Sequence, residues 1–215
     1  MRKRSLVLSL FLVVAVLFLG LGYARLTNTL HVGGTIGSTP DNSNLDVRFA
    51  NDTTSPAATK VSSDNVTVGG FSYESKSVTF GVAGFTAQGQ SATIILKVVN
   101  NSAEHADYDA YLEKVFDISM THGVGGTETA GGSQVNNTFE GEHFHVEVSY
   151  ISSYTNRLGE TVTATGTITE GQPRLNAVGN EYVFVQIHIT VEKPIVGAMD
   201  EHQFTVSFDA YTVAE

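Results

Sequence analysis

Alternating apolar residues run through the stretch Tyr182-Val183-Phe184-Val185-Gln186-Ile187-His188-Ile189-Thr190-Val191. A period of two places every second side chain on the same face, which is the pattern of a half-buried β-strand. The same period, or a short apolar run, predicts further strands at residues 45–49, 77–82, 91–99, 143–151, 161–169 and 203–213. Clusters of glycine and serine separate these segments, so the sequence predicts an all-β protein with an antiparallel, jelly-roll-like β-sandwich.

One segment departs from the period of two. Over residues 106–116, Tyr108, Leu112 and either Val115 or Phe116 are spaced close to the 3.6 residues of a helical turn. We therefore expect one short helix at 106–116 beside the strands.

The N-terminus has the layout of an export signal. Met1-Arg2-Lys3-Arg4 is basic, residues 6–21 are almost purely apolar, and Gly22 and Ala24 are the small residues of a cleavage site. We expect cleavage after Ala24 and a secreted or cell-surface protein that meets a membrane only through this signal. The alternative is an uncleaved anchor, because the apolar run is close to the lower limit of ~17 residues for a membrane span.

The rest of the chain suits a single β domain. About 191 residues remain after residues 1–24, and sandwiches of roughly 200 residues often form one unit. A half-buried strand is predicted at 25–36, where Leu26, Leu30, Val32 and Ile36 share one face and Thr27, Thr29, His31 and Thr35 share the other. A linker of glycine, serine, proline and asparagine follows, so we divide the chain into a signal (1–24), a strand with its linker (25–44) and the β-sandwich (45–215).

The charge and the cysteine content argue against several functions and kinds of site. The signal holds three of the 12 basic residues and none of the 22 acidic ones, so its removal shifts the formal charge from −10 to −13. Such an acidic chain is not expected to bind nucleic acid. The chain has no cysteine, which excludes disulfides and thiolate metal sites. Sequons of the form Asn-x-Ser/Thr, which arise by chance too, make four residues candidates for glycosylation: Asn51, Asn65, Asn100 and Asn136.

Four segments carry a resemblance to a known family. They are Leu26-Thr27-Asn28-Thr29-Leu30-His31-Val32-Gly33-Gly34-Thr35, then Asn44-Leu45-Asp46-Val47-Arg48-Phe49, and finally Val82-Ala83-Gly84-Phe85-Thr86-Ala87-Gln88-Gly89-Gln90-Ser91-Ala92 with Leu96-Lys97-Val98-Val99-Asn100-Asn101-Ser102. With the signal ending in Gly-Tyr-Ala, this order of elements resembles the TasA/camelysin family of biofilm matrix fibre proteins and the related archaeal bundling-pilus subunits. The proline that the family usually carries in the turn before residue 91 is absent here.

The resemblance implies that the chain polymerises with itself. The strand at 25–36 would be a donor strand, with Leu26, Leu30, Val32 and Ile36 inserted into a groove of the next subunit, and the fibres could bundle laterally in a biofilm matrix. The alternative is that 25–36 is the first strand of its own sandwich. The chain would then be a monomeric surface-binding or adhesion module.

A camelysin-like secreted metalloprotease is a third hypothesis, so the sequence was searched for metal ligands. His143, His145 and Glu147 would lie on one face of a strand, and His188 could add a ligand from a neighbouring strand. The favoured interpretation is a solvated polar face, since no base and no open metal position can be identified. We therefore expect a protein that is not an enzyme and has no required cofactor. Acidic pairs that could bind calcium lie at 107–109, 140–142 and 200–201.

Overall fold

The computed structural model of the chain describes residues 45–50, 57–103, 108–122, 132–193 and 202–212. All of them belong to one compact unit, Pro40–Glu215. The predicted signal at 1–24 and the predicted strand at 25–36 lie outside the described residues. Within the described ranges, no helix has the length and apolar character needed to cross a membrane.

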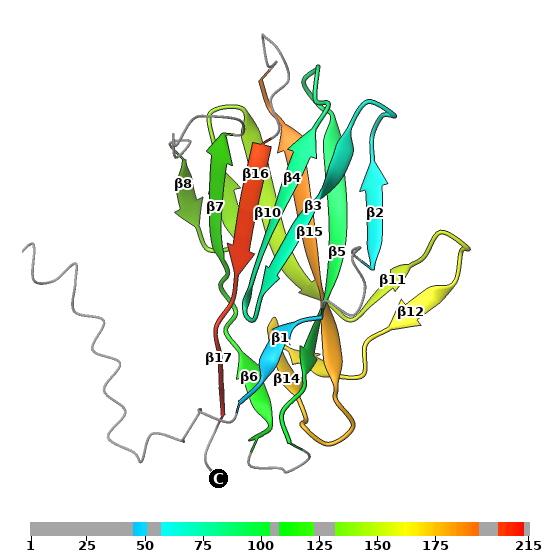
Figure 1. Cartoon of the computed structure of the whole chain (residues 1–215), viewed down its shortest axis with the longest axis vertical. Helices are drawn as coiled ribbons and strands as arrows, with labels where there is room; N and C mark the ends of the chain where they lie inside the picture. The colour runs from blue at the N-terminus through cyan, green and yellow to red at the C-terminus, as the bar shows by residue number, and fades with distance from the viewer. Residues whose placement is uncertain (1–44, 51–56, 104–107, 123–131, 194–201, 213–215) are drawn as a thin grey trace, which may run out of the picture. The chain divides into compact units, whose positions relative to one another are not determined.

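The described residues form antiparallel β-strands and almost no helix, which confirms the predicted all-β class (Figure 1). In chain order the strands are β1 (Val47–Phe49), β2 (Ala58–Val61), β3 (Thr67–Glu74), β4 (Ser77–Ala83), β5 (Ser91–Asn100), β6 (Ala110–Leu112), β7 (Asp117–His122), β8 (Ser133–Val135), β9 (Thr138–Glu140), β10 (Phe144–Ile151), β11 (Ser153–Thr155), β12 (Thr161–Thr163), β13 (Thr167–Thr169), β14 (Gln172–Leu175), β15 (Tyr182–Val191), β16 (His202–Ser207) and β17 (Ala210–Thr212).

The largest sheet has seven strands in the order β1-β5-β15-β10-β9-β8, with β2 also paired to β5. Its centre is the pair β5 and β15, which are ten residues long each and remain in register from Ser91 opposite Thr190 to Val99 opposite Tyr182. Alternate residues of β15 are buried, as the period of two predicts. The strands predicted at 91–99, 143–151 and 182–191 are confirmed as β5, β10 and β15.

A second sheet has the order β3-β4-β16-β7 and shares one hydrophobic core with the first. Phe144 of β10 and Phe204 of β16 meet edge to face with ring centroids 5.7 Å apart. Phe204 also stacks on Phe80 of β4 at 5.9 Å. Aromatic contacts of this kind contribute about 0.5–1.5 kcal/mol beyond the area that they bury. The core therefore joins side chains from both sheets.

The single strand predicted at 161–169 is wrong. The chain forms β12 and β13 there, and these belong to different sheets, the hairpin β11-β12 and the sheet β13-β14-β6-β17. Gly166 stands between them, and a Cβ at this position would lie 2.3 Å from Leu175 Cδ2. Only glycine permits this close approach, so the chain changes direction where the period of two had suggested continuity.

The predicted helix at 106–116 is also wrong. Residues 110–112 form β6, which pairs with β14 and β17. Ala110 and Leu112 are buried, and Tyr111 between them stacks on Tyr211 with ring centroids 6.1 Å apart. Strand pairing with residues far along the chain has overridden the local helical spacing, which such a short segment leaves weakly determined.

Candidate functional site

A groove runs between the edge strands β2 and β3. Its cavity volume is about 760 Å³. The apolar part of its lining comes from Val61, Val66, Val68 and Phe71. Val66 is fully buried, and the other three are partly buried against the main core. The groove therefore leads from the surface to the hydrophobic core.

Both strands that border the groove have an open edge. Within the described ranges, β2 pairs only with β5, and β3 pairs only with β4. The outer N–H and C=O groups of an edge strand are available to another strand, which is why exposed edges invite strand addition. The eight residues of β3 offer the longer of the two edges.

Gly84 determines where the loop between β2 and β3 lies. Its backbone has φ +90°, and a Cβ there would be 1.5 Å from the carbonyl oxygen of Asn65. No other residue type fits such a contact. The loop is thus held against the segment that follows β4, and Val66 is placed at the floor of the groove.

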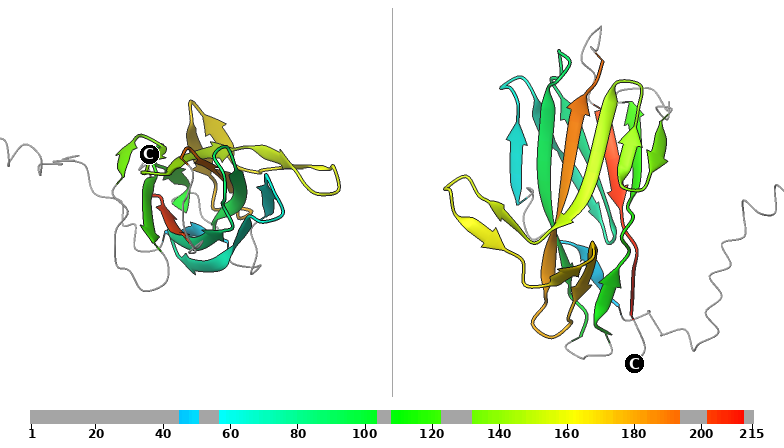
Figure 2. Two further views of the ribbon diagram at one scale, coloured as in Figure 1. Left: turned by 90° about the horizontal axis from the view of Figure 1, so that it is seen from above. Right: turned by 180° about the vertical axis from the view of Figure 1, so that it is seen from behind.

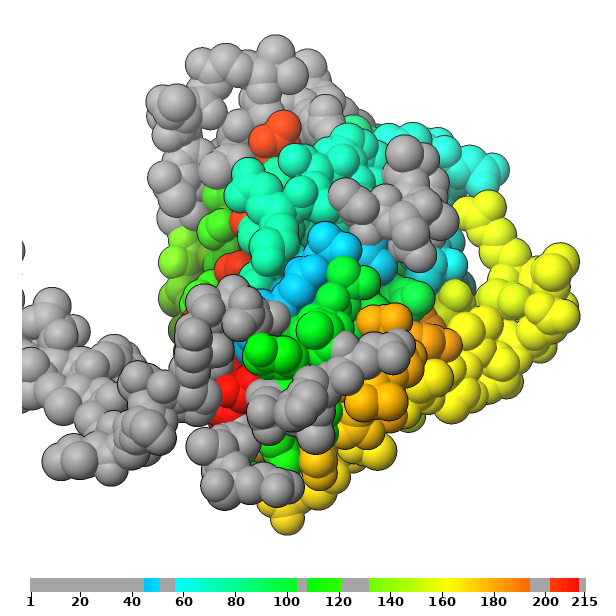
Figure 3. Space-filling model, turned by 60° about the horizontal axis from the view of Figure 1, so that its bottom comes forward, coloured from blue at the N-terminus to red at the C-terminus, as the bar shows by residue number. Residues whose placement is uncertain are grey.

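The hairpin β11-β12 projects from the body of the strands (Figure 2), and its turn contributes to the lining of the groove. Its turn is held by Asn156, whose Oδ1 accepts hydrogen bonds from the backbone N–H groups of Leu158 at 2.9 Å and Glu160 at 3.0 Å. Asn156, Arg157 and Leu158 line the groove, and Leu158 is 82% exposed. Figure 3 shows the hairpin, in yellow, standing out from the surface beside β2. A large apolar side chain is therefore presented to solvent at the mouth of the groove.

The opposite seam between the two sheets is closed. Gln134 of β8 accepts a hydrogen bond from the N–H of Ile118 at 2.8 Å and donates to the carbonyl of Phe116. Asn137 accepts from the N–H of Phe116 at 2.9 Å and donates to the carbonyl of Lys114 at 2.8 Å. These side chains satisfy backbone groups that an added strand would otherwise use. The two seams thus differ in the described part of the chain: side chains of Gln134 and Asn137 bridge the seam between β7 and β8, and a groove lies between β2 and β3.

The structure describes some of the predicted site residues and not others. The apolar face of the first strand (Leu26, Leu30, Val32, Ile36) and the sequon at Asn51 lie outside the described residues, as do Asp107 and the acidic pair at 200–201. Asn65 and Asn136 lie in turns and are exposed. Asp109 accepts hydrogen bonds from Arg174 at 3.1 Å and from the N–H of Ala177 at 3.0 Å, and so has a structural role.

The prediction for Asn100 needs correction, because this residue is buried. Its Nδ2 donates to the carbonyls of Tyr108 at 2.8 Å and Leu175 at 3.0 Å, and its side chain has no exposed surface. An N-linked glycan replaces one hydrogen of this nitrogen and needs space around it, so the folded protein cannot carry one at Asn100. The Oδ1 of the same side chain accepts from the N–H of Ser102 at 3.1 Å.

The predicted metal ligands are brought together only in part. His145 lies between two carboxylates, with Nδ1 2.6 Å from Glu140 Oε1 and Nε2 3.2 Å from Glu147 Oε1. His188 instead shares hydrogen bonds with the hydroxyls of Thr93 at 2.9 Å and Thr190 at 3.2 Å. His143 precedes β10 and its buried Nδ1 has no hydrogen-bond partner in the described part of the chain.

The pKa of His145 is raised above its usual value of 6.5. Partial burial is the largest single influence and lowers the pKa, but the hydrogen bonds to Glu147 and Glu140 and the charges of both carboxylates together outweigh it. The side chain is therefore in an environment that attracts a positive charge.

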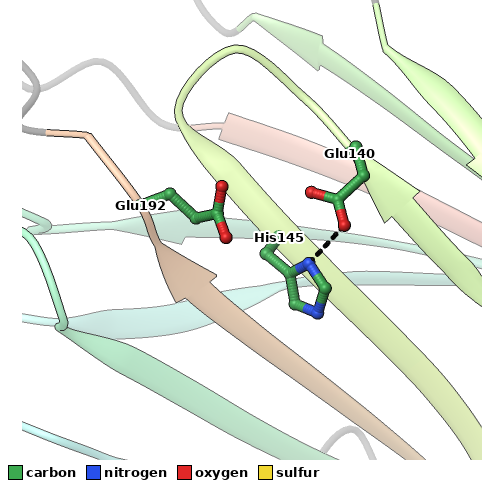
Figure 4. A group of neighbouring side chains, drawn as sticks. All are labelled: Glu140, His145 and Glu192. Carbon is green, nitrogen blue, oxygen red and sulfur yellow. Dashed lines mark hydrogen bonds and ion pairs between the residues drawn. The ribbon is translucent and has the colours of Figure 1, made fainter.

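Glu140 and Glu192 complete a cluster with His145, and one ligand atom from each of the three lies within 4.8 Å of the others (Figure 4). The sequence contained a weak signal for Glu140, as part of the acidic pair at 140–142, and none for Glu192. Comparisons with known proteins give no further guide, because no protein-family model, curated protein or solved structure matches the chain.

Proposed function

We propose that this chain is a structural subunit of an extracellular fibre whose subunits join head to tail by donor-strand complementation. The observation that carries the proposal is the apolar groove between two open strand edges, β2 and β3. In the proposal, the two main sheets form a β-sandwich of jelly-roll type with one incomplete seam. Residues 25–36 of a neighbouring subunit fill that seam.

The predicted donor strand suits the groove in pattern and in length. Leu26, Leu30, Val32 and Ile36 would all face the core, where Val68 and Phe71 are only partly buried. Burial of four such side chains contributes about 6–12 kcal/mol before the cost of ordering the strand. At ~3.3 Å per residue, the eight residues of β3 extend over about 26 Å, so most of 25–36 can pair along that edge.

The difference between the two seams favours a linear polymer. Each subunit has the groove between β2 and β3 and one predicted donor, and at the opposite seam Gln134 already bonds the N–H of Ile118 and the carbonyl of Phe116. A head-to-tail contact of this kind continues from subunit to subunit unless its rotation closes a ring. The predicted export signal and the resemblance to TasA-like fibre proteins and bundling-pilus subunits support the same proposal. Lateral bundling in a biofilm matrix would then be a contact between fibres.

Two substitutions on opposite faces of the predicted donor strand test the proposal. We expect Val32→Asp to abolish filaments in negative-stain electron microscopy, because it places a charge in the apolar groove. Thr29→Asp introduces the same charge on the other face and should leave filaments intact. Filaments formed equally by both variants would contradict donor-strand assembly.

A groove substitution tests the acceptor separately. Thr59 of β2 lines the groove and lies opposite the fully buried Ile94, so its side chain is on the core side of the sheet. Thr59→Asp therefore places a charge where the apolar side chains of the donor would pack. A synthetic peptide of residues 25–36 should bind the Val32→Asp protein in fluorescence anisotropy and fail to bind the protein that also carries Thr59→Asp. Ser72→Asp, exposed on β3 and outside the groove lining, is the matched control.

The alternative predicts a different result. If 25–36 completes its own subunit, the wild-type protein stays monomeric at every concentration, while the peptide still binds the Val32→Asp variant. That result would replace the fibre subunit by a monomeric surface module. No binding of the peptide to any variant would exclude the groove as an acceptor.

A further inference from the structure

The outer face of the seven-stranded sheet brings three metal-ligand side chains to one point. Glu140 ends β9, His145 lies near the start of β10, and Glu192 follows β15. Their ligand atoms lie within 4.8 Å of one another, and Figure 4 shows His145 between the two carboxylates. The three come from separate strands, so folding creates the cluster.

Strand pairing holds the three backbones in place. His145 is directly opposite Glu140 in the β9–β10 pair. The β10–β15 pair stays in register over eight residues, and it is extended by a hydrogen bond of 2.8 Å from the N–H of Glu192 to the carbonyl of His143. Only the side chains need to move for the ligand atoms to approach each other.

We infer that Glu140, His145 and Glu192 bind one divalent transition-metal ion of the Zn²⁺ class. Zinc ligands lie about 2.1 Å from the ion, so two ligands at a tetrahedral angle are roughly 3.4 Å apart. Side-chain rotations of Glu140 and Glu192, both exposed, suffice to bring their oxygens from the present separation to this one. A fourth position is left for water.

Glu147 supports this role by contacting His145 and not the metal position. Its Oε1 lies 3.2 Å from His145 Nε2, on the side of the ring away from Glu140. A carboxylate there holds the hydrogen on Nε2, and this leaves the lone pair of Nδ1 directed at the metal position. Carboxylate partners of this kind orient histidine ligands in many metal sites and raise their basicity.

The charge of the cluster also favours a cation. Three carboxylates surround one imidazole, so the group stays at −2 even when His145 is protonated. In the described part of the chain, no lysine or arginine forms an ion pair with Glu140, Glu147 or Glu192. A divalent ion neutralises the two carboxylates that bind it.

The ligand set selects among metals. An imidazole nitrogen suits zinc and its first-row neighbours, whereas calcium takes six to eight oxygen ligands. The site is therefore expected to bind Zn²⁺ and to discriminate against Ca²⁺. It would lie on an outer sheet face and does not depend on the proposed assembly at the β2–β3 groove.

Isothermal titration calorimetry of the purified protein with ZnCl₂ tests the inference. We expect one Zn²⁺ per chain, no heat with CaCl₂, and reversal by EDTA. Glu192→Gln and His145→Gln should each weaken Zn²⁺ binding at least tenfold. Glu147→Gln should weaken it by about 10–100-fold, the usual cost of removing a carboxylate that orients a histidine ligand. Glu142→Gln, an exposed neighbour outside the cluster, should leave the affinity unchanged.

Two results would overturn the inference. One is the absence of Zn²⁺ binding at micromolar protein. The other is binding that Glu192→Gln and His145→Gln leave unchanged, which would place the ion elsewhere. Circular dichroism of each variant shows whether it folds. The His145 ring signals in an NMR titration with Zn²⁺ report directly on the ligand: they should shift in the wild-type protein at Zn²⁺ concentrations at least tenfold lower than in Glu192→Gln.

Discussion

Tyr150 has a hydroxyl that is buried and, in the described ranges, has no hydrogen-bond partner. Its ring packs on Phe116 with centroids 4.4 Å apart. Burial, with the charge of Glu113 as a second cause, raises the pKa of Tyr150 well above the usual value of 10.0. In the unfolded chain the hydroxyl ionises near pH 10. The folded state keeps its proton at a pH where the unfolded state loses it, so stability falls as the pH rises above about 10.

Tyr150→Phe tests this account. We expect the free energy of unfolding at pH 7 to increase by about 1 kcal/mol, because an unsatisfied hydroxyl no longer has to be buried. Between pH 10 and pH 11 the wild-type protein should lose about 1 kcal/mol more than the variant, because the unfolded chain is only half ionised at pH 10. Urea unfolding at pH 7, 10 and 11 measures both effects. Parallel pH profiles of the two proteins would show that folding does not suppress the ionisation of the Tyr150 hydroxyl.

Asn100 and Ser102 belong to a glycosylation sequon, but their side chains have a structural role in the fold. Residues 100–102 form a glycosylation sequon, yet Asn100 joins two buried carbonyls and Ser102 Oγ accepts the N–H of Asp46 at 2.8 Å. The motif therefore anchors β1 and the segment before β6 to the end of β5. A sequon shows only that a glycosyltransferase could modify the unfolded chain. Whether the folded protein can carry the glycan depends on how exposed the asparagine is.

At the scale of elements, the long central strands were predictable and the short ones were not. In β5, β10 and β15 the period of two persists over eight to ten residues, enough to exclude a helix. Strands of three or four residues, such as β8, β9 and β14, are too short for any period to be distinct. They form because longer neighbouring strands provide hydrogen-bond partners. These partners are far away in the sequence, so the residues of a short strand do not by themselves predict it.

The hairpin β11-β12 is an element whose stability should be separable from that of the core. Asn156→Ala removes the hydrogen bonds that hold its turn, including one of 2.9 Å to Glu160 Oε2. We expect backbone amide exchange over 153–163 to accelerate by roughly tenfold, the equivalent of about 1.4 kcal/mol. The free energy of global unfolding should change by less than about 0.5 kcal/mol.

Arg157→Ala is the control for the hairpin, because this side chain is exposed at the same turn. It should leave the exchange rates of 153–163 as they are. An equal loss of global stability in the Asn156→Ala protein would mean that the hairpin unfolds together with the core, contrary to this prediction.

At the scale of the whole described unit, the two seams between the sheets depend on different interactions. Gln134→Ala removes the bonds to Ile118 and Phe116 at the closed seam. We expect the free energy of unfolding to fall by about 1–3 kcal/mol, because backbone groups lose their partners. Chemical denaturation measures the change, and Ser133→Ala, exposed on the same strand, should be neutral. A neutral result for Gln134→Ala would show that the core alone holds this seam.

The candidate sites show the same limit of prediction at this larger scale. The alternating pattern placed His145 and Glu147 on one face of β10, and the structure agrees. Glu192 could not be assigned, because its approach to His145 depends on the register between β10 and β15, which no local pattern encodes. The groove was expected only through a family resemblance, and its position between β2 and β3 required the sheet order.

The unequal seams also have a mechanical consequence. Side-chain bridges at Gln134 and Asn137 cross from β8 and the β8–β9 turn to the segment leading into β7, so force that pulls the sheets apart on this side must break several hydrogen bonds together. On the β2–β3 side the two sheets are joined by apolar contacts, by the loop that connects β2 to β3 at one end, and by a hydrogen bond of 2.8 Å from the N–H of Phe49 to the carbonyl of Ser75 at the other. Apolar contacts resist separation weakly and over a short distance. Under tension the two sheets would therefore separate first on the β2–β3 side, while the seam at Gln134 and Asn137 stays bonded and acts as the hinge.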